Sequence, residues 1–256
     1  MLLASLGTTG GTVLVLAGLG AGIVNGIAGG GSLISFPALL AFGYSPLVAN
    51  VSSTVGILPG ALGGVAGFRG EIDSQRERLR ELLGTVVLGA IGGGALLLTT
   101  PAGYFSLVVP YLILGACVLF ALQPLIARRF GEPAHRPSGR RRALLHVGAL
   151  AAAAYGAYFG AGLGIVLIAV LGTSLPDSLV RLSGLRIALA LVVNGVAAVV
   201  FALSAPVAWV PVGLMAGSSV LGGYLGARIA RAVRPAVLRV VVVTFGVVTA
   251  AFLLAG

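Results

Sequence analysis

The sequence predicts an all-α polytopic membrane protein, and both its composition and the length of its apolar segments point to this class. Of the 256 residues, 58% are hydrophobic and only 9% are charged, whereas a soluble domain carries about 25% charged residues. A soluble protein of this length would lack the polar side chains needed to cover its surface. The segments are apolar on all sides over roughly 20 residues, which suits membrane helices, whereas barrel strands alternate apolar and polar residues.

Eight apolar segments fall into two groups of four. Residues 128–142 separate the groups and hold six Arg, two Pro and two Gly, so we expect a polar cytoplasmic linker there. We divide the chain into a first membrane repeat (1–127), this linker, and a second membrane repeat (143–256). The segments are residues 11–43, 48–68, 82–99, 104–127, 144–172, 182–203, 207–227 and 236–255.

Two of these segments are too long for a single straight crossing. As one helix, residues 11–43 would reach ~50 Å and residues 144–172 ~43 Å, against a hydrocarbon core of ~30 Å. Each has a glycine cluster near its middle. Each is therefore either one long tilted span or a broken, re-entrant hairpin that enters the bilayer and returns to the same side.

The distribution of arginine favours the hairpins. All 16 basic residues are Arg, in clusters of four, six, two and four along the chain, and the net charge is +10. If every segment crossed once, ten Arg would lie on one face and six on the other. If residues 144–172 form a hairpin, all 16 lie on one face, which the positive-inside rule prefers. Because these Arg flank apolar spans, we expect the lipid bilayer as their partner and no binding of nucleic acid.

The predicted architecture is therefore two inverted-topology repeats, each a broken, Gly-rich helical hairpin followed by three transmembrane helices. An odd number of crossings in the first half inverts the second half. Gly22, Gly26 and Gly30 recur as three glycines 134 residues further on, which suggests an internal repeat. Inverted repeats with broken helices near the midplane are common in secondary transporters. We expect a multi-pass protein of the inner (plasma) membrane, with its Arg clusters in the cytoplasm.

The first long segment carries a polar, glycine-rich stretch, Asn25 to Ser32, at its centre. Three consecutive glycines disfavour a continuous helix by about 1 kcal/mol each relative to Ala. Broken backbone at this depth is tolerated only where protein buries it or where it lines a cavity. Ser32 is placed to cap a second helical arm. The stretch is either a binding site or a place of close helix packing.

Further polar residues follow in the spans of both halves. The hydroxyl groups after Asn50 either line a pathway or bond back to their own helix. Arg186 lies a turn inside its span, so it either snorkels to the inner interface or attracts substrate. Asn194 lies deeper and needs a partner. The candidate substrate-binding residues are Asn25, Gly29, Gly30, Gly31, Ser32, Ser52, Ser53, Thr54, Gly162, Gly164, Arg186 and Asn194.

The residue types missing from the spans exclude other functions. No Asp or Glu lies within an apolar segment, and His135 and His146 fall at the predicted inner boundary. A cation or metal carrier would place carboxylates or His in the membrane, and a hydrolase would need a nucleophile or acid–base pair. We therefore expect no enzyme activity, no metal and no cofactor. Glycine N–H groups, hydroxyls, amides and one Arg suit a small oxyanion.

The longest motifs resemble those of a known transporter family. GIVNGIAGGGSLISFPALLAFG, followed by ANVSSTVGILPGALGGVAGFRGEI, resembles the first half of the TauE/SafE (TSUP) family of sulfite exporters. GAYFGAGLGIVLIAVLG and AWVPVGLMAGSSVLGGYLGARIA resemble its second half. The resemblance implies a transporter, expected to act as an exporter, of sulfite, a sulfonate or a related organic anion that works by alternating access. The alternatives are a carrier of another small solute and a non-transporting membrane assembly protein.

Overall fold

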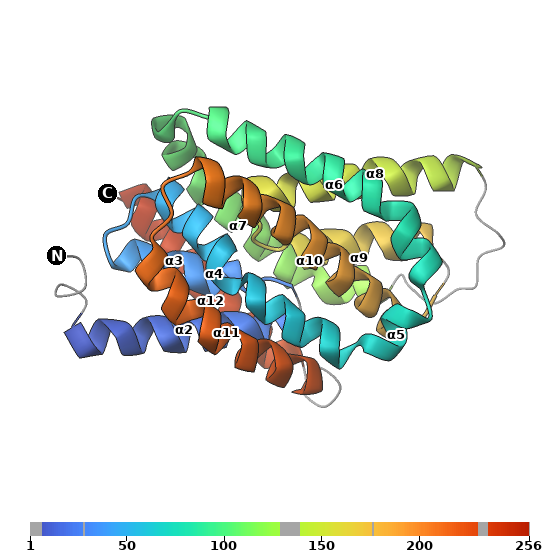
Figure 1. Ribbon diagram of the computed structural model, residues 1–256, viewed down its shortest axis with the longest axis horizontal. Helices are drawn as coiled ribbons and strands as arrows, with labels where there is room; N and C mark the ends of the chain where they lie inside the picture. Colours follow the sequence, from blue (N-terminus) through green and yellow to red (C-terminus); the bar gives the residue numbers. More distant parts are fainter. Residues whose placement is uncertain (1–6, 28, 129–138, 176, 230–234, 256) are drawn as a thin grey trace.

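A computed structural model describes residues 7–27, 29–128, 139–175, 177–229 and 235–255. Within these residues the regular structure is helical and no strand occurs, which confirms the all-α class (Figure 1). Six of the described helices contain a stretch that is long and apolar enough to cross a membrane, in agreement with the predicted class. These stretches are Thr9–Ile27, Pro46–Gly67, Arg76–Thr99, Ala102–Leu122, Leu179–Ser204 and Trp209–Ile229.

Each of the two overlong segments is broken into a long helix and a short one. The first becomes α2 (Gly7–Ile27) and α3 (Ser32–Ala41), and the second becomes α8 (Gly139–Tyr158) and α9 (Leu163–Ser174). At 1.5 Å per residue the short helices reach only about half of the ~30 Å hydrocarbon core. The predicted interruptions are therefore present in the fold.

The chain doubles back at both breaks. A Cβ atom built on Gly20 would lie 3.7 Å from Cδ1 of Ile34, so α3 returns along α2. A Cβ atom on Gly148 would lie 2.8 Å from Cγ1 of Val170, so α9 returns along α8 in the same way. Figure 1 shows α3 lying toward the end of the bundle where α2 begins. Each broken segment is a helical hairpin.

The register that relates the two breaks differs from the one that the glycine pattern suggested. The long helices end at Ile27 and Tyr158, which are 131 residues apart. Gly29 and Gly160, which have φ angles of 77° and 80°, keep the same separation of 131 residues. The offset of 134 pairs Gly26, which lies inside α2, with Gly160, which lies in the second break, so the repeated glycines do not mark equivalent positions of the two breaks.

The remaining helices follow the same order in both halves, with a short extra helix in the first half. Around the predicted linker, α7 continues to Arg128 and α8 begins at Gly139, while residues 129–138 lie outside the described residues. The helices are α4 (Pro46–Gly67), α5 (Arg69–Asp73), α6 (Arg76–Thr99), α7 (Ala102–Arg128), α10 (Leu179–Ser204), α11 (Trp209–Ile229) and α12 (Pro235–Ala255).

Each half packs one of its helices against two helices of the other half. Helix α11 of the second half packs against α2 and α4 of the first, and α6 of the first half packs against α8 and α10 of the second. The contact of α11 is between backbones: a Cβ atom on Gly22 would collide with the carbonyl of Ser219, and one on Gly223 with the carbonyl of Gly60. Small residues allow this close approach, which packs apolar helices without large side chains.

Charged residues gather at one end of the bundle, which we call the Arg-rich end. Arg78 pairs with Asp177 at 2.5 Å and Arg142 pairs with Glu81 at 2.7 Å, so the starts of α6 and α8 and the segment before α10 lie together. Figure 1 shows α5 at this end, while α2 begins and α12 finishes at the opposite end. Which membrane face the Arg-rich end contacts stays a prediction.

Candidate functional site

The two helix breaks touch each other inside the bundle. The backbone N–H of Gly164 donates a hydrogen bond to the carbonyl of Gly29 at 3.1 Å. A Cβ atom on Gly29 would lie 2.5 Å from Cα of Gly164, and Gly29 has a φ of 77°, so only glycine fits there. Near this contact, the hydroxyl of Ser32 lies 3.6 Å from where a Cβ atom of Gly160 would be.

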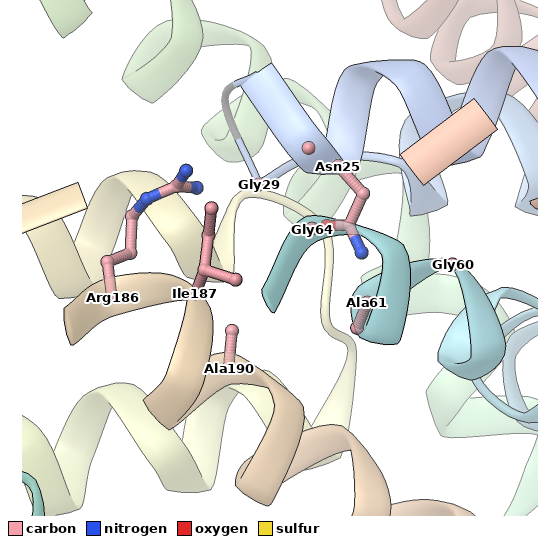
Figure 2. Close-up of a pocket in the computed structure, with 9 residues that line it drawn as sticks. Asn25, Gly29, Gly60, Ala61, Gly64, Arg186, Ile187 and Ala190 are labelled. Atoms are coloured by element: carbon pink, nitrogen blue, oxygen red, sulfur yellow. The ribbon is translucent and has the colours of Figure 1, made fainter. Parts of the chain in front are cut away.

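Arg186 lies against this junction. It is in the second turn of α10, its exposed fraction is 3%, and its Nη1 is the atom nearest to a Cβ position on Gly29. Figure 2 shows the guanidinium directed toward Gly29 and Asn25. The alternative that Arg186 snorkels to water is therefore wrong in this conformation.

The guanidinium of Arg186 has no neutralising partner among the residues that the structure describes. None of their carboxylates lies within ion-pair distance of it, and none of their acceptors receives a hydrogen bond from it. Burying an unpaired cation costs several kcal/mol even after relaxation. A buried cation held beside broken backbone therefore suits a site that an anion occupies for part of the time.

A small recess separates Arg186 from the first-half helices. Its free volume is about 10 Å³, which is about enough for one water molecule. A larger ligand can enter only if α10 separates from α2 and α4. The lining residues, most of which Figure 2 labels, are Asn25, Gly26, Gly29, Gly60, Ala61, Gly64, Arg186, Ile187 and Ala190.

Of the predicted site residues, the structure brings Asn25, Gly29 and Arg186 to the recess, with Gly164 in contact with Gly29. Gly162, whose φ is 79°, instead lies beside Ala116. The junction therefore combines Asn25 and Gly29 of the first half with Gly164 and Arg186 of the second.

The other glycines and the serine of the first break have packing roles. A Cβ atom on Gly30 would collide with the ring of Phe120, and one on Gly31 with the carbonyl of Ala21. Ser32 is the first residue of α3, whose N-cap is Gly31 and has no side-chain cap. The expectation that Ser32 caps this helix is therefore wrong, because the helix begins at Ser32 itself, one residue earlier than a serine cap at this position requires.

The hydroxyl groups of α4 are buried and all have partners away from the recess. Ser52 accepts a hydrogen bond from the N–H of Ala208 at 2.9 Å. The hydroxyls of Ser53 and Ser35 are 2.6 Å apart. Thr54 donates to the carbonyl of Asn50 on its own helix at 3.1 Å. These three side chains join helices or bond locally, and none of them lines the recess in this conformation.

Asn194 also lies away from the junction. It is half-buried on α10, about one turn beyond Ala190, which is the last residue of that helix at the recess. No hydrogen bond of its side chain to another described residue is found. Any part it takes in binding would require α10 to move.

Asn50 forms a hydrogen bond at the second break, and it was not among the predicted site residues. The side-chain amide of Asn50 donates to the carbonyl of Tyr158 at 3.0 Å. Tyr158 ends α8, where carbonyl groups lose their helical partners. Asn50, on a helix of the first half, therefore supplies a hydrogen-bond donor to a carbonyl at the second break. A buried Asn in an apolar span was visible in the sequence, but its partner 108 residues away was not.

None of the described acidic residues lines the recess. No group of three or more His, Cys, Asp or Glu that could hold a metal ion occurs in the described part of the chain. Asp73, Glu81 and Asp177 form ion pairs with Arg at the Arg-rich end. The fixed charge at the recess is therefore positive, which suits an anionic ligand.

Apolar helices with two breaks that meet beside a buried cation define a polytopic membrane protein with an enclosed polar centre, an arrangement that many small-solute transporters share. The sequence profile described as "Sulfite exporter TauE/SafE" matches residues 14–253, and the chain belongs to this family of membrane transporters.

Curated relatives agree with this assignment. A "Probable membrane transporter protein" of Haemophilus influenzae is 27% identical over 226 residues, which cover 84% of this chain and 83% of the relative. The "Probable membrane transporter protein YfcA" of Escherichia coli K12 is 25% identical over 243 residues, or 94% of this chain and 88% of the relative. A "Probable membrane transporter protein ORF9" of Sinorhizobium is 32% identical over 116 residues, 43% of this chain and 42% of its own. No solved structure matches the chain.

Proposed function

We propose that this transporter moves a small anion such as sulfite, a sulfonate or a related organic anion out of the cell, and that the anion binds at Arg186. The single observation that carries the proposal is the buried guanidinium beside the junction of the two breaks, without a carboxylate partner among the described residues. Membership of the family supports the same class of substrate.

The chemistry of the recess supports an oxyanion. A guanidinium presents a planar fork of donors that matches two oxygens of a carboxylate, sulfonate or sulfite. The short helix α3 begins just beyond Gly29, and helix N-termini favour negative charge. The amide of Asn25 adds a neutral polar group at the wall. A cation would meet Arg186 with nothing to offset the repulsion.

We propose further that the two halves are inverted repeats that work by alternating access. The packing between the halves supports this arrangement. Helix α11 packs against α2 and α4 of the other half, and α6 packs against the corresponding helices α8 and α10. The close glycine contacts hold α2, α4 and α11 together as one group, and we assign α6, α8 and α10 to the other, although α10 also packs against α4. The recess lies between these groups, since α2 and α4 form one wall and α10 the other. Separation of the groups would open it.

The direction and driving force follow from charge. We place the Arg-rich end in the cytoplasm, so that the protein is a multi-pass component of the inner membrane. The inside-negative potential then drives an anion outward by ~2.3 kcal/mol per charge per 100 mV. Proton-coupled carriers commonly use an acidic residue or His within the membrane; the apolar segments contain no Asp or Glu, and His146 falls at the predicted inner boundary. Efflux therefore needs no coupling ion.

Transport in proteoliposomes tests the proposal. We expect the purified protein to move a radiolabelled sulfonate, with competition by other oxyanions and none by small cations. Arg186→Gln should abolish this flux and Arg186→Lys should retain part of it, because Lys keeps the charge and loses the fork. Arg142→Gln, which removes an exposed Arg at the Arg-rich end, is the matched control. Equal flux with Arg186→Gln and Arg142→Gln would refute the assignment, and absence of flux for every anion would favour an assembly role.

A further inference from the structure

We infer that Phe68, Ile187 and Ala227 form an apolar gate between the Arg186 recess and a second anion-binding cavity at the Arg-rich end, lined by Arg228. The inference rests on the proposed function and adds to it a second site and the element that separates the two sites. The gate residues are a buried cluster distinct from the main core, with exposed fractions of 4%, 5% and 1%.

The position of the gate follows from shared residues. Ile187 belongs to the cluster and also lines the recess. Ala227 belongs to the cluster and also lines the outer cavity. The cluster therefore lies between the two spaces, and Phe68, at the junction of α4 and α5, is its largest side chain.

The outer cavity has the size and charge of an anion-binding site. Its volume is about 340 Å³, whereas the recess has room for about one water molecule. The guanidinium carbon of Arg228 lies 4.7 Å from the centre of the Tyr224 ring, which orients the cation. No ion pair to Arg228 is found among the described carboxylates. The cavity lies where α4 and α11 end, and Ala66 and Gly67 form its other wall.

A polar clamp holds the gate closed. The side chain of Gln75, only 3% exposed, donates to the carbonyl of Arg181 at 2.7 Å and to that of Glu71 at 3.0 Å. A Cβ atom on Gly184 would lie 2.7 Å from Cβ of Glu71, so α5 rests on the first turns of α10. The segment that carries Phe68 is thereby fixed to the helix that carries Ile187 and Arg186.

The arrangement predicts an order of events. An anion from the Arg-rich side is first held at Arg228, outside the gate. It reaches Arg186 only when Phe68 moves away from Ile187, because an apolar constriction excludes water and ions. In the conformation described here, the gate separates the recess from the outer cavity.

Accessibility of a cysteine in the recess tests the gate without relying on transport. In a Cys117→Ser background, Ala190→Cys places a thiol on the wall of the recess. Proteoliposomes are treated from the Arg-rich side with the membrane-impermeant anionic reagent 2-sulfonatoethyl methanethiosulfonate, and Arg142→Cys in separate vesicles reports orientation. Phe68→Ala should speed labelling of Ala190→Cys by about tenfold or more, because the open state is the minor one in the parent protein.

Control variants distinguish faster labelling caused by an open gate from faster labelling caused by misfolding. Phe252→Ala truncates the same side chain where it is 77% exposed on α12, and should leave the labelling rate unchanged. Ile187→Ala shortens the opposite wall of the gate and should also accelerate labelling. A monodisperse elution profile in detergent identifies folded variants. Unchanged labelling in folded Phe68→Ala and Ile187→Ala proteins would overturn the gate.

The same assay distinguishes failure of the gate from failure of the proposed function. Arg228→Gln should slow labelling by the anionic reagent and not by the cationic 2-(trimethylammonium)ethyl analogue; equal slowing of both would overturn the Arg228 site. A non-reactive sulfonate should protect the cysteine in Phe68→Ala protein, and Arg186→Gln should remove this protection. Acceleration by Phe68→Ala without any protection would retain the gate and refute anion binding at Arg186.

Discussion

The carbonyl of Gly29 accepts a hydrogen bond from the N–H of Gly164 at 3.1 Å, and this bond joins the break of the first half to the break of the second. The guanidinium of Arg186 lies against the same glycine. Three chain segments that are far apart in sequence therefore meet where helical hydrogen bonding is interrupted. Backbone groups and a cation are brought together there without an acidic side chain among the recess residues.

Gly29→Ala is predicted to abolish transport by displacing Arg186. A Cβ atom at this position would collide with Nη1 of Arg186 and lie 2.5 Å from Cα of Gly164. Gly43→Ala is the matched control, because Gly43 also has a positive φ, 79°, and a Cβ atom there would meet nothing within 4 Å. Both variants should lose about 1 kcal/mol from backbone strain.

Flux assays and thermal unfolding of the two variants separate strain from contact. We expect Gly43→Ala to transport at close to the parent rate and Gly29→Ala to be inactive although folded. Similar flux in both variants would show that the contact of Gly29 with Arg186 has no part in transport.

Gly30→Val is predicted to abolish transport, and the structure changes the reason for it. The sequence suggested that bulk at the break would block the approach of the ligand. The structure instead directs a Cβ atom on Gly30 into the ring of Phe120. The double variant Gly30→Val with Phe120→Ala should therefore recover part of the flux, which the single variant lacks. No recovery in a folded double variant would favour direct blockage of the ligand.

Efflux is predicted to be electrogenic and largely uncoupled from protons. A potential set by a potassium gradient and valinomycin should change the flux of a fully ionised sulfonate, by up to ~2.3 kcal/mol of driving force per charge per 100 mV. A pH gradient alone should not change it. A sulfonate is preferred to sulfite, whose own charge varies with pH. Flux that followed the pH gradient and ignored the potential would overturn this mechanism.

Both ends of the chain are predicted to be extracytoplasmic, opposite the Arg-rich end. In the Cys117→Ser background, a cysteine in the 128–142 segment, for example Arg142→Cys, should react from the cytoplasmic side of membrane vesicles. A cysteine placed after Ala255 should react from the other side. The reagent is an impermeant maleimide added to vesicles of known orientation. Reaction of both positions from the same side would exclude the inverted arrangement.

The sequence allowed the breaks and part of the site to be predicted, for identifiable physical reasons. Residues 11–43 and 144–172 exceed the bilayer thickness and contain glycine clusters, so their interruption followed from length and composition. Asn25, Gly29 and Arg186 were proposed because polar groups deep in apolar spans need a partner or a cavity, and all three line the recess.

The partners of the other candidate residues depend on three-dimensional packing that local patterns do not encode. Ser52 and Ser53 were expected either to line a pathway or to bond within their own helix; in the structure they bond to Ala208 and Ser35 on other segments. The pairing of Asn50 with Tyr158 crosses the two halves. The repeated glycines did not mark equivalent positions, because Gly26 lies inside α2 whereas Gly160 lies in the second break.

Equilibrium binding to the purified transporter tests the central claim most directly. A radiolabelled sulfonate is titrated against the protein in lipid nanodiscs, with Arg186→Gln and the exposed-site control Arg142→Gln measured in parallel. Loss of a buried charged partner should weaken binding by 2–5 kcal/mol or more, which is about thirtyfold or more in affinity. We predict that Arg186→Gln loses saturable binding while Arg142→Gln binds like the parent protein. Parent-like affinity in a folded Arg186→Gln protein would contradict the account.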